Sequence, residues 1–224
     1  MIKFIKKNIN YIYLATVYIF ILLQYPTWLA ISNLLLHKNG AASILPQYLL
    51  LWGLIRILIV LPVLFALMNA EGMKSEKINL SFVKSKSIIY LTFWGTVVFS
   101  ILGLFLYPWF IHASSLTPLL LLEYLPFFLL FATTNAFVEE TFFRGAGLSF
   151  ISEKTNFWVA NAIQSFFFAL IHILNPLSSN PWLFVILTFF LGLFWGWLTR
   201  RTKSLVPAIA FHVVADLFVA ISLF

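Results

Sequence analysis

The stretch from Pro126 to Ile151 reads PFFLLFATTNAFVEETFFRGAGLSFI, and it decides the fold class of this protein. It is apolar along most of its length and long enough to cross a bilayer, since a membrane helix needs about 20 mostly apolar residues. The whole chain has this character: 62% of its 224 residues are apolar and only 9% are charged. A soluble domain carries about 25% charged residues, so we expect an all-α polytopic membrane helix bundle.

Other apolar runs of similar length flank this stretch. The segment Thr117–Tyr124, which contains Glu123 and precedes Pro126, is predicted to be an interfacial helix leading into the fourth span. Pro26 and Pro62 are predicted to kink the first and second spans, because proline removes a backbone donor. In all we predict seven transmembrane helices, at roughly 9–35, 45–69, 87–111, 126–151, 157–175, 182–199 and 205–223.

Lysine and arginine residues lie in alternate loops between these runs, and cytoplasmic loops are the ones that carry such an excess. With an odd number of spans, this places the N-terminus in the cytoplasm and the C-terminus outside. The net charge of +7 then reflects topology, and we expect no nucleic-acid partner. The composition, rich in lysine, isoleucine and phenylalanine, indicates a bacterial plasma membrane. The basic side is marked by Lys3, Lys6, Lys7, Lys74, Lys77, Lys84, Lys86, Lys154, Arg200, Arg201 and Lys203, and the other side by Lys38 alone.

The chain divides into two parts without an internal repeat. Residues 1–86 hold the N-terminal transmembrane helices and a cytoplasmic linker, and residues 87–224 form the helical core. Among the first three spans the only ionisable residue is Arg56, for which snorkelling to the interface and pairing with Glu123 are the alternatives. Cysteine is absent, which excludes disulfides and thiolate metal sites.

The last four spans hold a cluster of ionisable residues. A charged side chain at the bilayer centre costs at least ~2.5 kcal/mol, so such residues usually have a function. Counting from the cytoplasmic turns at about 1.5 Å per residue brings the three groups to a similar depth. The cluster consists of Glu139, Glu140 and Arg144 in the fourth span, His172 in the fifth, and His212 and Asp216 in the seventh.

Spacing assigns roles within this cluster. His212 and Asp216 are four residues apart and therefore share a helix face. Glu140 and Arg144 have the same spacing and can pair within their helix. Glu139 points about 100° away from Glu140, because an α-helix has 3.6 residues per turn. We therefore predict that Glu139 is the working carboxylate and that Glu140 holds Arg144.

Several other features have a structural interpretation. His37 and His112 lie near loop ends, where a histidine is usually just hydrogen-bonded to a neighbour. Gly192 and Gly196 are four residues apart and predict close helix packing. The phenylalanines at 166–168 predict packing and contact with lipid.

Three short motifs lie in order along the C-terminal part of the chain. They are Glu139-Glu140-Thr-Phe-Phe-Arg144, Phe168-Ala-Leu-Ile-His172 and His212-Val-Val-Ala-Asp216. With them, residues 120–223 resemble the CPBP family of intramembrane peptidases, also called the CAAX protease, bacteriocin-processing or Abi family. That family's motifs are Glu-Glu-x-x-x-Arg, Phe-x-x-x-His and His-x-x-x-Asn. Residues 1–110 resemble nothing that we can name.

The resemblance implies hydrolysis by an activated water. Glu139 and His172 would activate the water, and His212 and residue 216 would stabilise the oxyanion or complete a metal site. The residues agree with this, since no cysteine and no suitably placed serine offers another nucleophile. Family members act on prenylated CAAX tails, on bacteriocin-type peptides or in self-immunity, and a prenylated substrate does not fit a bacterial host well.

Asp216 departs from the family pattern, which has asparagine there. An asparagine amide donates a hydrogen bond to an oxyanion, whereas an ionised aspartate cannot. Asp216 is then either protonated or a metal ligand. Two histidines and two carboxylates would suit Zn²⁺ with one position left for water, and a metal-independent glutamate mechanism is the alternative. The candidate ligand set is Glu139, His172, His212 and Asp216.

The sequence therefore predicts an intramembrane endopeptidase whose partners are the lipid bilayer and a membrane-associated peptide or protein. One alternative is a non-catalytic immunity or scaffold protein that retains the motifs. Another is a proton-coupled transporter, since intramembrane carboxylates and histidines also mark ion pathways. Transporters usually show repeated halves and broken helices, which this chain lacks.

Overall fold

The computed structural model describes residues 49–70, 78–81, 83, 85–110, 117–174 and 180–221. Within these ranges every secondary-structure element is a helix, which confirms the prediction of an all-α fold. The first predicted span at 9–35 lies outside the described residues, and so do Pro26, His37 and His112.

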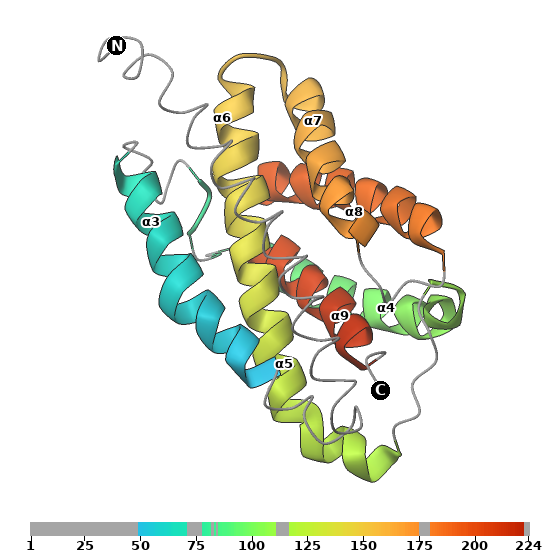
Figure 1. The fold of residues 1–224 in the computed structure, drawn as a ribbon. Helices are drawn as coiled ribbons and strands as arrows, with labels where there is room; N and C mark the ends of the chain where they lie inside the picture. The colour runs from blue at the N-terminus through green and yellow to red at the C-terminus, as the bar shows by residue number, and fades with distance from the viewer. Residues whose placement is uncertain are drawn as a thin grey trace.

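One long helical rod runs through the middle of the molecule. It consists of α5 (Pro118–Glu140), the π-helical segment η2 (Thr141–Gly147) and α6 (Leu148–Ser152), and it appears yellow-green to yellow in Figure 1. The Thr117 side chain caps its start by accepting a hydrogen bond from the Leu120 amide at 3.3 Å. A separate interfacial helix ahead of the fourth span is wrong, because α5 continues through Pro126 without a break. A proline costs one backbone hydrogen bond, and membrane helices tolerate that loss.

The first described helix lies alongside this rod (Figure 1). It begins at Leu49 and continues through the π-helical segment η1 (Arg56–Val60) into α3 (Leu61–Ala70). Segment η1 ends two residues before Pro62, whose missing amide hydrogen leaves the Leu58 carbonyl without its α-helical donor. The disturbance predicted at Pro62 thus takes the form of a π-helical turn, and η1 packs against α5.

Helix α9 (Val206–Ile221) packs against α5 on one side and against α4 (Lys86–Phe110) on the other. Two glycines of α4 allow the close approach. A Cβ atom at Gly95 would lie 2.7 Å from the Phe211 ring, and one at Gly103 would overlap the Phe218 ring. Aromatic rings of α9 therefore fill the space that these glycines leave, and this contact fixes the helix that carries His212.

Helices α7 (Phe157–Leu170) and α8 (Pro181–Thr202) form an antiparallel pair, and the 3-10 turn η3 (Ile171–Leu174) follows α7. A Cβ atom at Gly192 would lie 3.0 Å from that of Ser165, and one at Gly196 would overlap Asn161. The close packing predicted for these two glycines is confirmed. It brings buried polar groups of α7 against the α8 backbone, where the Asn161 amide donates to the Leu193 carbonyl at 2.9 Å.

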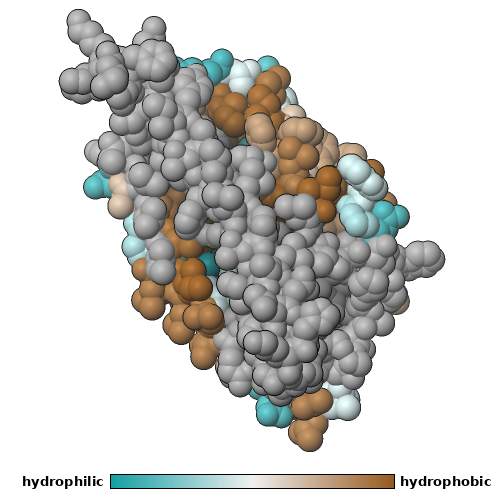
Figure 2. Space-filling view, viewed as in Figure 1, coloured by the Kyte–Doolittle hydropathy of each residue, from teal (hydrophilic) through white to brown (hydrophobic). Residues whose placement is uncertain are grey.

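In the described part of the chain, three helices are long and apolar enough to cross a membrane: Lys86–Phe105, Pro118–Ser152 and Pro181–Thr202. Three shorter apolar helices accompany them, at Leu49–Leu58, Phe157–Ile173 and Val206–Ile221. Large apolar side chains such as Trp94, Trp158 and Phe190 are exposed, and Figure 2 shows apolar side chains over the outside of α7. Such a surface suits contact with lipid.

Candidate active site

The predicted cluster forms where the middle of the rod meets α9. Helix α5 ends with Glu139 and Glu140, η2 contributes Arg144, and α9 contributes His212 and Asp216. All five side chains are buried. His212 joins the two elements, because its ring nitrogens face both glutamates. The structure thus brings together the predicted residues of the fourth and seventh spans.

Glu140 is tightly held by two donors on a single oxygen. Its Oε1 lies 2.9 Å from Arg144 Nη1 and 2.8 Å from His212 Nδ1. Charge-assisted hydrogen bonds of this length are among the strong ones in proteins. The pair of Glu140 with Arg144 is the one that the four-residue spacing predicted. The additional contact of Glu140 with His212 ties the end of α5 to α9.

The guanidinium of Arg144 is surrounded by aromatic rings. It lies 3.9 Å from the centroid of Phe168 and 5.3 Å from that of Trp195. Cation–π attraction strengthens when the cation is removed from water, and Arg144 is fully buried. Glu140 and these two rings therefore compensate a charge that would otherwise be costly at this depth.

Both arginines near the glutamates lie in π-helical segments, Arg56 in η1 and Arg144 in η2. A π-helical turn is wider than an α-helical one and shifts the direction of the side chains that follow. Such turns occur frequently at functional sites. The two π-helical segments thus flank the Glu139–Glu140 pair from different helices.

Glu139 is held much more loosely than its neighbour. Its Oε1 lies 3.7 Å from Arg56 Nη2, and its Oε2 lies 3.7 Å from His212 Nε2. Both distances exceed those of a hydrogen bond, and among the described residues neither oxygen has a hydrogen-bond partner. Only 1% of the surface of Glu139 is exposed to solvent. Glu139 is therefore a buried carboxylate with capacity to bind a water molecule or a substrate group.

The position of Arg56 corrects both alternatives considered for it. Its side chain is buried and faces Glu139, so it neither snorkels nor pairs with Glu123. Glu123 is exposed near the start of α5, about 24 Å along the helix from Glu139 at 1.5 Å per residue. Arg56 also lies over the Trp52 ring at 4.8 Å. The contact arises because η1 packs beside the last turns of α5, which the sequence did not reveal.

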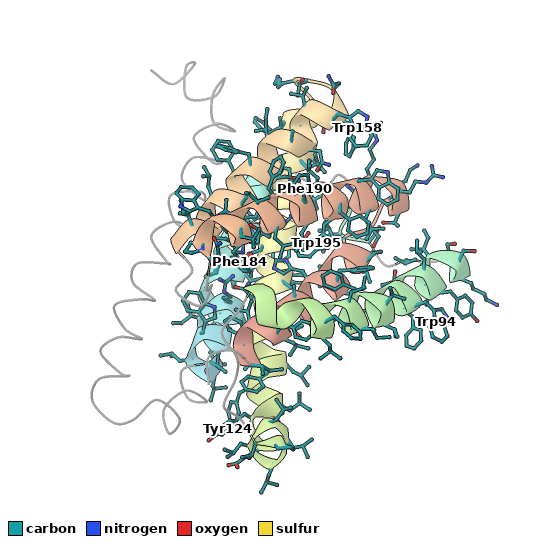
Figure 3. The ribbon with its side chains drawn as sticks, turned by 90° about the vertical axis from the view of Figure 1, so that its right-hand side faces the viewer. Trp94, Tyr124, Trp158, Phe184, Phe190 and Trp195 are labelled. Carbon is teal, nitrogen blue, oxygen red and sulfur yellow. The ribbon has the colours of Figure 1, made fainter. Side chains whose placement is uncertain are left out.

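The ring of His212 is fixed from several sides. It stacks on the Trp195 ring with centroids 4.6 Å apart and an interplanar angle of 23°. Its Nε2 lies 3.5 Å from Asp216 Oδ1 in addition to its approach to Glu139. Figure 3 labels Trp195 on α8, between the helices that carry the cluster. Packing and charge together give this imidazole a single orientation.

His172 lies across the Phe168 ring from His212. The Phe168 centroid is 4.7 Å from the His172 ring and 5.7 Å from the His212 ring. Nδ1 of His172 lies 2.8 Å from the Phe168 carbonyl oxygen, which can only accept a hydrogen bond. Nδ1 therefore carries the proton, and Nε2 is left as an acceptor. Phe184, also labelled in Figure 3, packs against this ring at 5.7 Å.

Asn135 is a member of this group that sequence reasoning missed. Its Nδ2 donates to Asp216 Oδ2 at 3.0 Å, and both side chains are buried. Asn135 is uncharged, so it did not stand out as an intramembrane charge does. Its one signal was spacing, because it lies four residues before Glu139 and shares that face of the helix.

Of the four predicted zinc ligands, Glu139 and Asp216 lie 3.7 and 3.5 Å from His212 Nε2, whereas His172 lies across the Phe168 ring from His212. The described residues contain no group of three histidine, aspartate or glutamate side chains that could hold a metal ion. We therefore derive no step of the chemistry through a metal.

A comparison with known families now adds to this geometry. Residues 121–218 match the family of type II CAAX prenyl endopeptidases described as Rce1-like. Residues 121–218 thus form an Rce1-like domain. No curated protein and no solved structure matches the chain.

The Rce1-like domain contains all six predicted site residues and Asn135. Arg56 lies outside it, on the preceding helix, and still reaches Glu139. Similarity to an endopeptidase family agrees with the buried glutamates and histidines of this domain. The part of the chain before residue 121 nevertheless contributes one charged group to the cluster.

Proposed function

We propose that this protein is an intramembrane endopeptidase that cleaves a membrane-associated peptide or protein, with Glu139 as the group that activates water. One observation carries the proposal. Glu139 is a buried carboxylate whose two oxygens lack hydrogen-bond partners among the described residues, yet it lies between Arg56 and His212. A buried polar group without partners costs free energy, and a catalytic role is one reason why a folded protein keeps such a group.

The chemistry follows from the groups around Glu139. Glu139 accepts a proton from water as the water oxygen attacks the carbonyl carbon of the peptide bond. Nε2 of His172, left as an acceptor, is a second group that can orient this water. The tetrahedral intermediate then collapses, the C–N bond breaks, and Glu139 returns the proton to the leaving nitrogen. His212 faces Glu139 with Nε2, and because Nδ1 donates to Glu140, Nε2 donates to the oxyanion when the ring is an imidazolium with a proton on both nitrogens.

Glu140 and Arg144 act on this reaction indirectly. Glu140 binds Nδ1 of His212, which directs Nε2 toward Glu139 and Asp216. Arg144 balances the charge of Glu140 and is itself held by Phe168 and Trp195. We assign to these two residues the orientation of His212.

The proposed substrate is a peptide segment that reaches the site from the membrane. The sequence left three cases open: a prenylated tail, a bacteriocin-type peptide and a role in self-immunity. The amino-acid composition of the chain, which indicates a bacterial host, favours the last two. Two probe peptides test whether cleavage requires a prenyl group. One is a farnesylated peptide ending in Cys-aliphatic-aliphatic-X, and the other has the same sequence without the prenyl group.

The decisive experiment compares Glu139→Gln with Glu123→Gln in the purified full-length protein. Both remove a carboxylate from α5, but Glu123 is exposed and remote from the cluster. We expect Glu139→Gln to fold and to lose cleavage of the probe peptides, followed by mass spectrometry, and Glu123→Gln to remain active. A fully active Glu139→Gln variant would show that this carboxylate does not activate water. A biological phenotype that survives in Glu139→Gln would favour a scaffold or immunity protein.

We also propose the predicted membrane topology, with seven spans, a cytoplasmic N-terminus and an external C-terminus. The support is the alternation of basic loops together with the apolar helices. A phosphatase fusion, active only outside the cytoplasm, should be active when joined after Phe224. A fusion that works only inside the cytoplasm would reverse the orientation or change the span count.

A further inference from the structure

Asn135 is oriented by its partner. Its Nδ2 lies 3.0 Å from Asp216 Oδ2, and the two residues are on different helices. An ionised carboxylate can only accept hydrogen bonds, so the NH₂ end of the amide must face Asp216. Asp216 therefore fixes which end of the Asn135 amide points into the cluster.

The Asn135–Asp216 pair is connected to Glu139 through His212. Asp216 Oδ1 lies 3.5 Å from His212 Nε2, and that nitrogen also faces Glu139 Oε2 at 3.7 Å. Asn135 and Glu139 share a face of α5, one turn apart. The amide is thus placed beside the position where water and substrate would meet Glu139.

Peptide hydrolysis needs donors aimed at the carbonyl oxygen that becomes negatively charged. Asp216 Oδ2 already accepts from Asn135 and is not placed to donate to that carbonyl oxygen. An amide NH₂ group has two N–H donors, and within the described residues Asn135 Nδ2 makes one hydrogen bond, to Asp216. We propose that Asn135 donates its second N–H to the carbonyl oxygen of the scissile bond, together with His212, while Asp216 positions Asn135.

This assignment rests on the proposed peptidase function and can fail separately from it. The test is Asn135→Leu in the full-length protein in nanodiscs, assayed with whichever probe peptide the wild type cleaves. Leucine keeps the size of the side chain and removes the amide. Removing one oxyanion donor costs about 10²–10³-fold in kcat, and we expect a loss of this size with little change in KM.

Thr134→Val is the matched control. Thr134 is the neighbouring buried polar residue, and its hydroxyl donates to the Leu130 carbonyl of its own helix at 2.8 Å. We expect this variant to keep the wild-type kcat. An Asn135→Leu protein that is folded and as active as Thr134→Val would overturn the assignment.

A second comparison keeps the test decisive if Asn135→Leu does not fold. Asn135→Asp places two carboxylates against each other, and adding Asp216→Asn restores a donor and an acceptor in exchanged positions. We expect the double variant to regain folded protein but to keep a kcat at least about 10²-fold below wild type, because residue 135 is then a carboxylate without an N–H to donate. A folded double variant with the wild-type kcat would overturn the inference. A wild type that cleaves neither probe peptide would remove the proposed function and this inference with it.

Discussion

Helices α4 and α5 are both long and apolar, yet they satisfy their polar side chains in opposite ways. In α4 the hydroxyls of Thr92, Thr96 and Ser100 donate to carbonyls one turn earlier in the same helix, at 2.7, 2.7 and 2.8 Å. At the end of α5, Asn135 and Glu140 reach partners on α9, 81 and 72 positions away along the chain.

The difference follows from the chemistry of the side chains. A hydroxyl can bond a backbone carbonyl of its own helix, so it places little demand on other helices. An ionised carboxylate has no proton to donate to a carbonyl of its own helix, so it needs a donor side chain, which for Glu140 is Arg144 one turn on and His212 on α9. Polar residues in an apolar helix therefore indicate a site when their partners lie on other helices. The three hydroxyls of α4 have their partners within α4 itself.

The largest effect should come from Glu140→Gln, which breaks the α5–α9 contact at its strongest point. The carboxylate balances Arg144 and binds His212 through the same oxygen. Removing one partner of a buried ion pair costs about 3–5 kcal/mol. We expect a lower yield of folded protein by size-exclusion chromatography, a lower Tm and no peptide cleavage.

Glu139→Gln is the counterpart of this variant, since its carboxylate lacks short contacts among the described residues. It should keep the wild-type yield and Tm. If both variants lose folded protein to the same extent, the division between a working and a structural glutamate is wrong.

Arg56→Met should have the next largest effect and extends the comparison to the helix before the Rce1-like domain. Arg56 faces Glu139 at 3.7 Å, and its charge favours the ionised carboxylate that takes the proton from water. We expect about a tenfold decrease in kcat, which corresponds to about 1.4 kcal/mol. Arg56→Lys keeps the charge but not the planar guanidinium and should be intermediate. Equal activity of Arg56→Met and wild type would limit the site to the family domain.

The sequence predicted the fold well where apolar length was the signal. The runs at 157–175, 182–199 and 205–223 correspond closely to α7 with η3, to α8 and to α9. Spacing within one helix also predicted the Glu140–Arg144 pair correctly. These features depend only on residues near each other in the chain.

Contacts between helices were the part that could not be predicted. The pairing of Arg56 with Glu139 depends on how η1 packs against α5, and that of Asn135 with Asp216 depends on the register of α5 against α9. The π-helical segments that carry both arginines leave no sequence pattern of their own. Intramembrane charge located the site, but it could not show which partner each group would find.

A smaller effect is expected for Asp216→Asn, assayed with and without a chelator. The asparagine carbonyl can still accept from Asn135, so we expect a folded protein with a modest loss of kcat. Because the described carboxylates and histidines form no group that could hold a metal, the chelator should change neither wild type nor variant. Loss of wild-type activity in chelator, with recovery on adding zinc, would restore the predicted ligand set.

The smallest effect is expected in α4, where Thr96→Val removes a hydroxyl that donates to its own helix. Surface substitutions away from special features usually change stability by within about 0.5 kcal/mol, and valine replaces threonine with almost the same shape. Cleavage of the probe peptide and Tm should both match the wild type. Thr134→Val in α5 should behave in the same way, because its hydroxyl is also satisfied by its own helix. If Thr96→Val lowered kcat while Thr134→Val did not, α4 would contact the substrate, and the contrast between the two helices would have to be drawn differently. If neither variant changed kcat or Tm, the site would be distinguished from the rest of the bundle by side-chain hydrogen bonds between helices. The helix that carries the polar residue would then not matter.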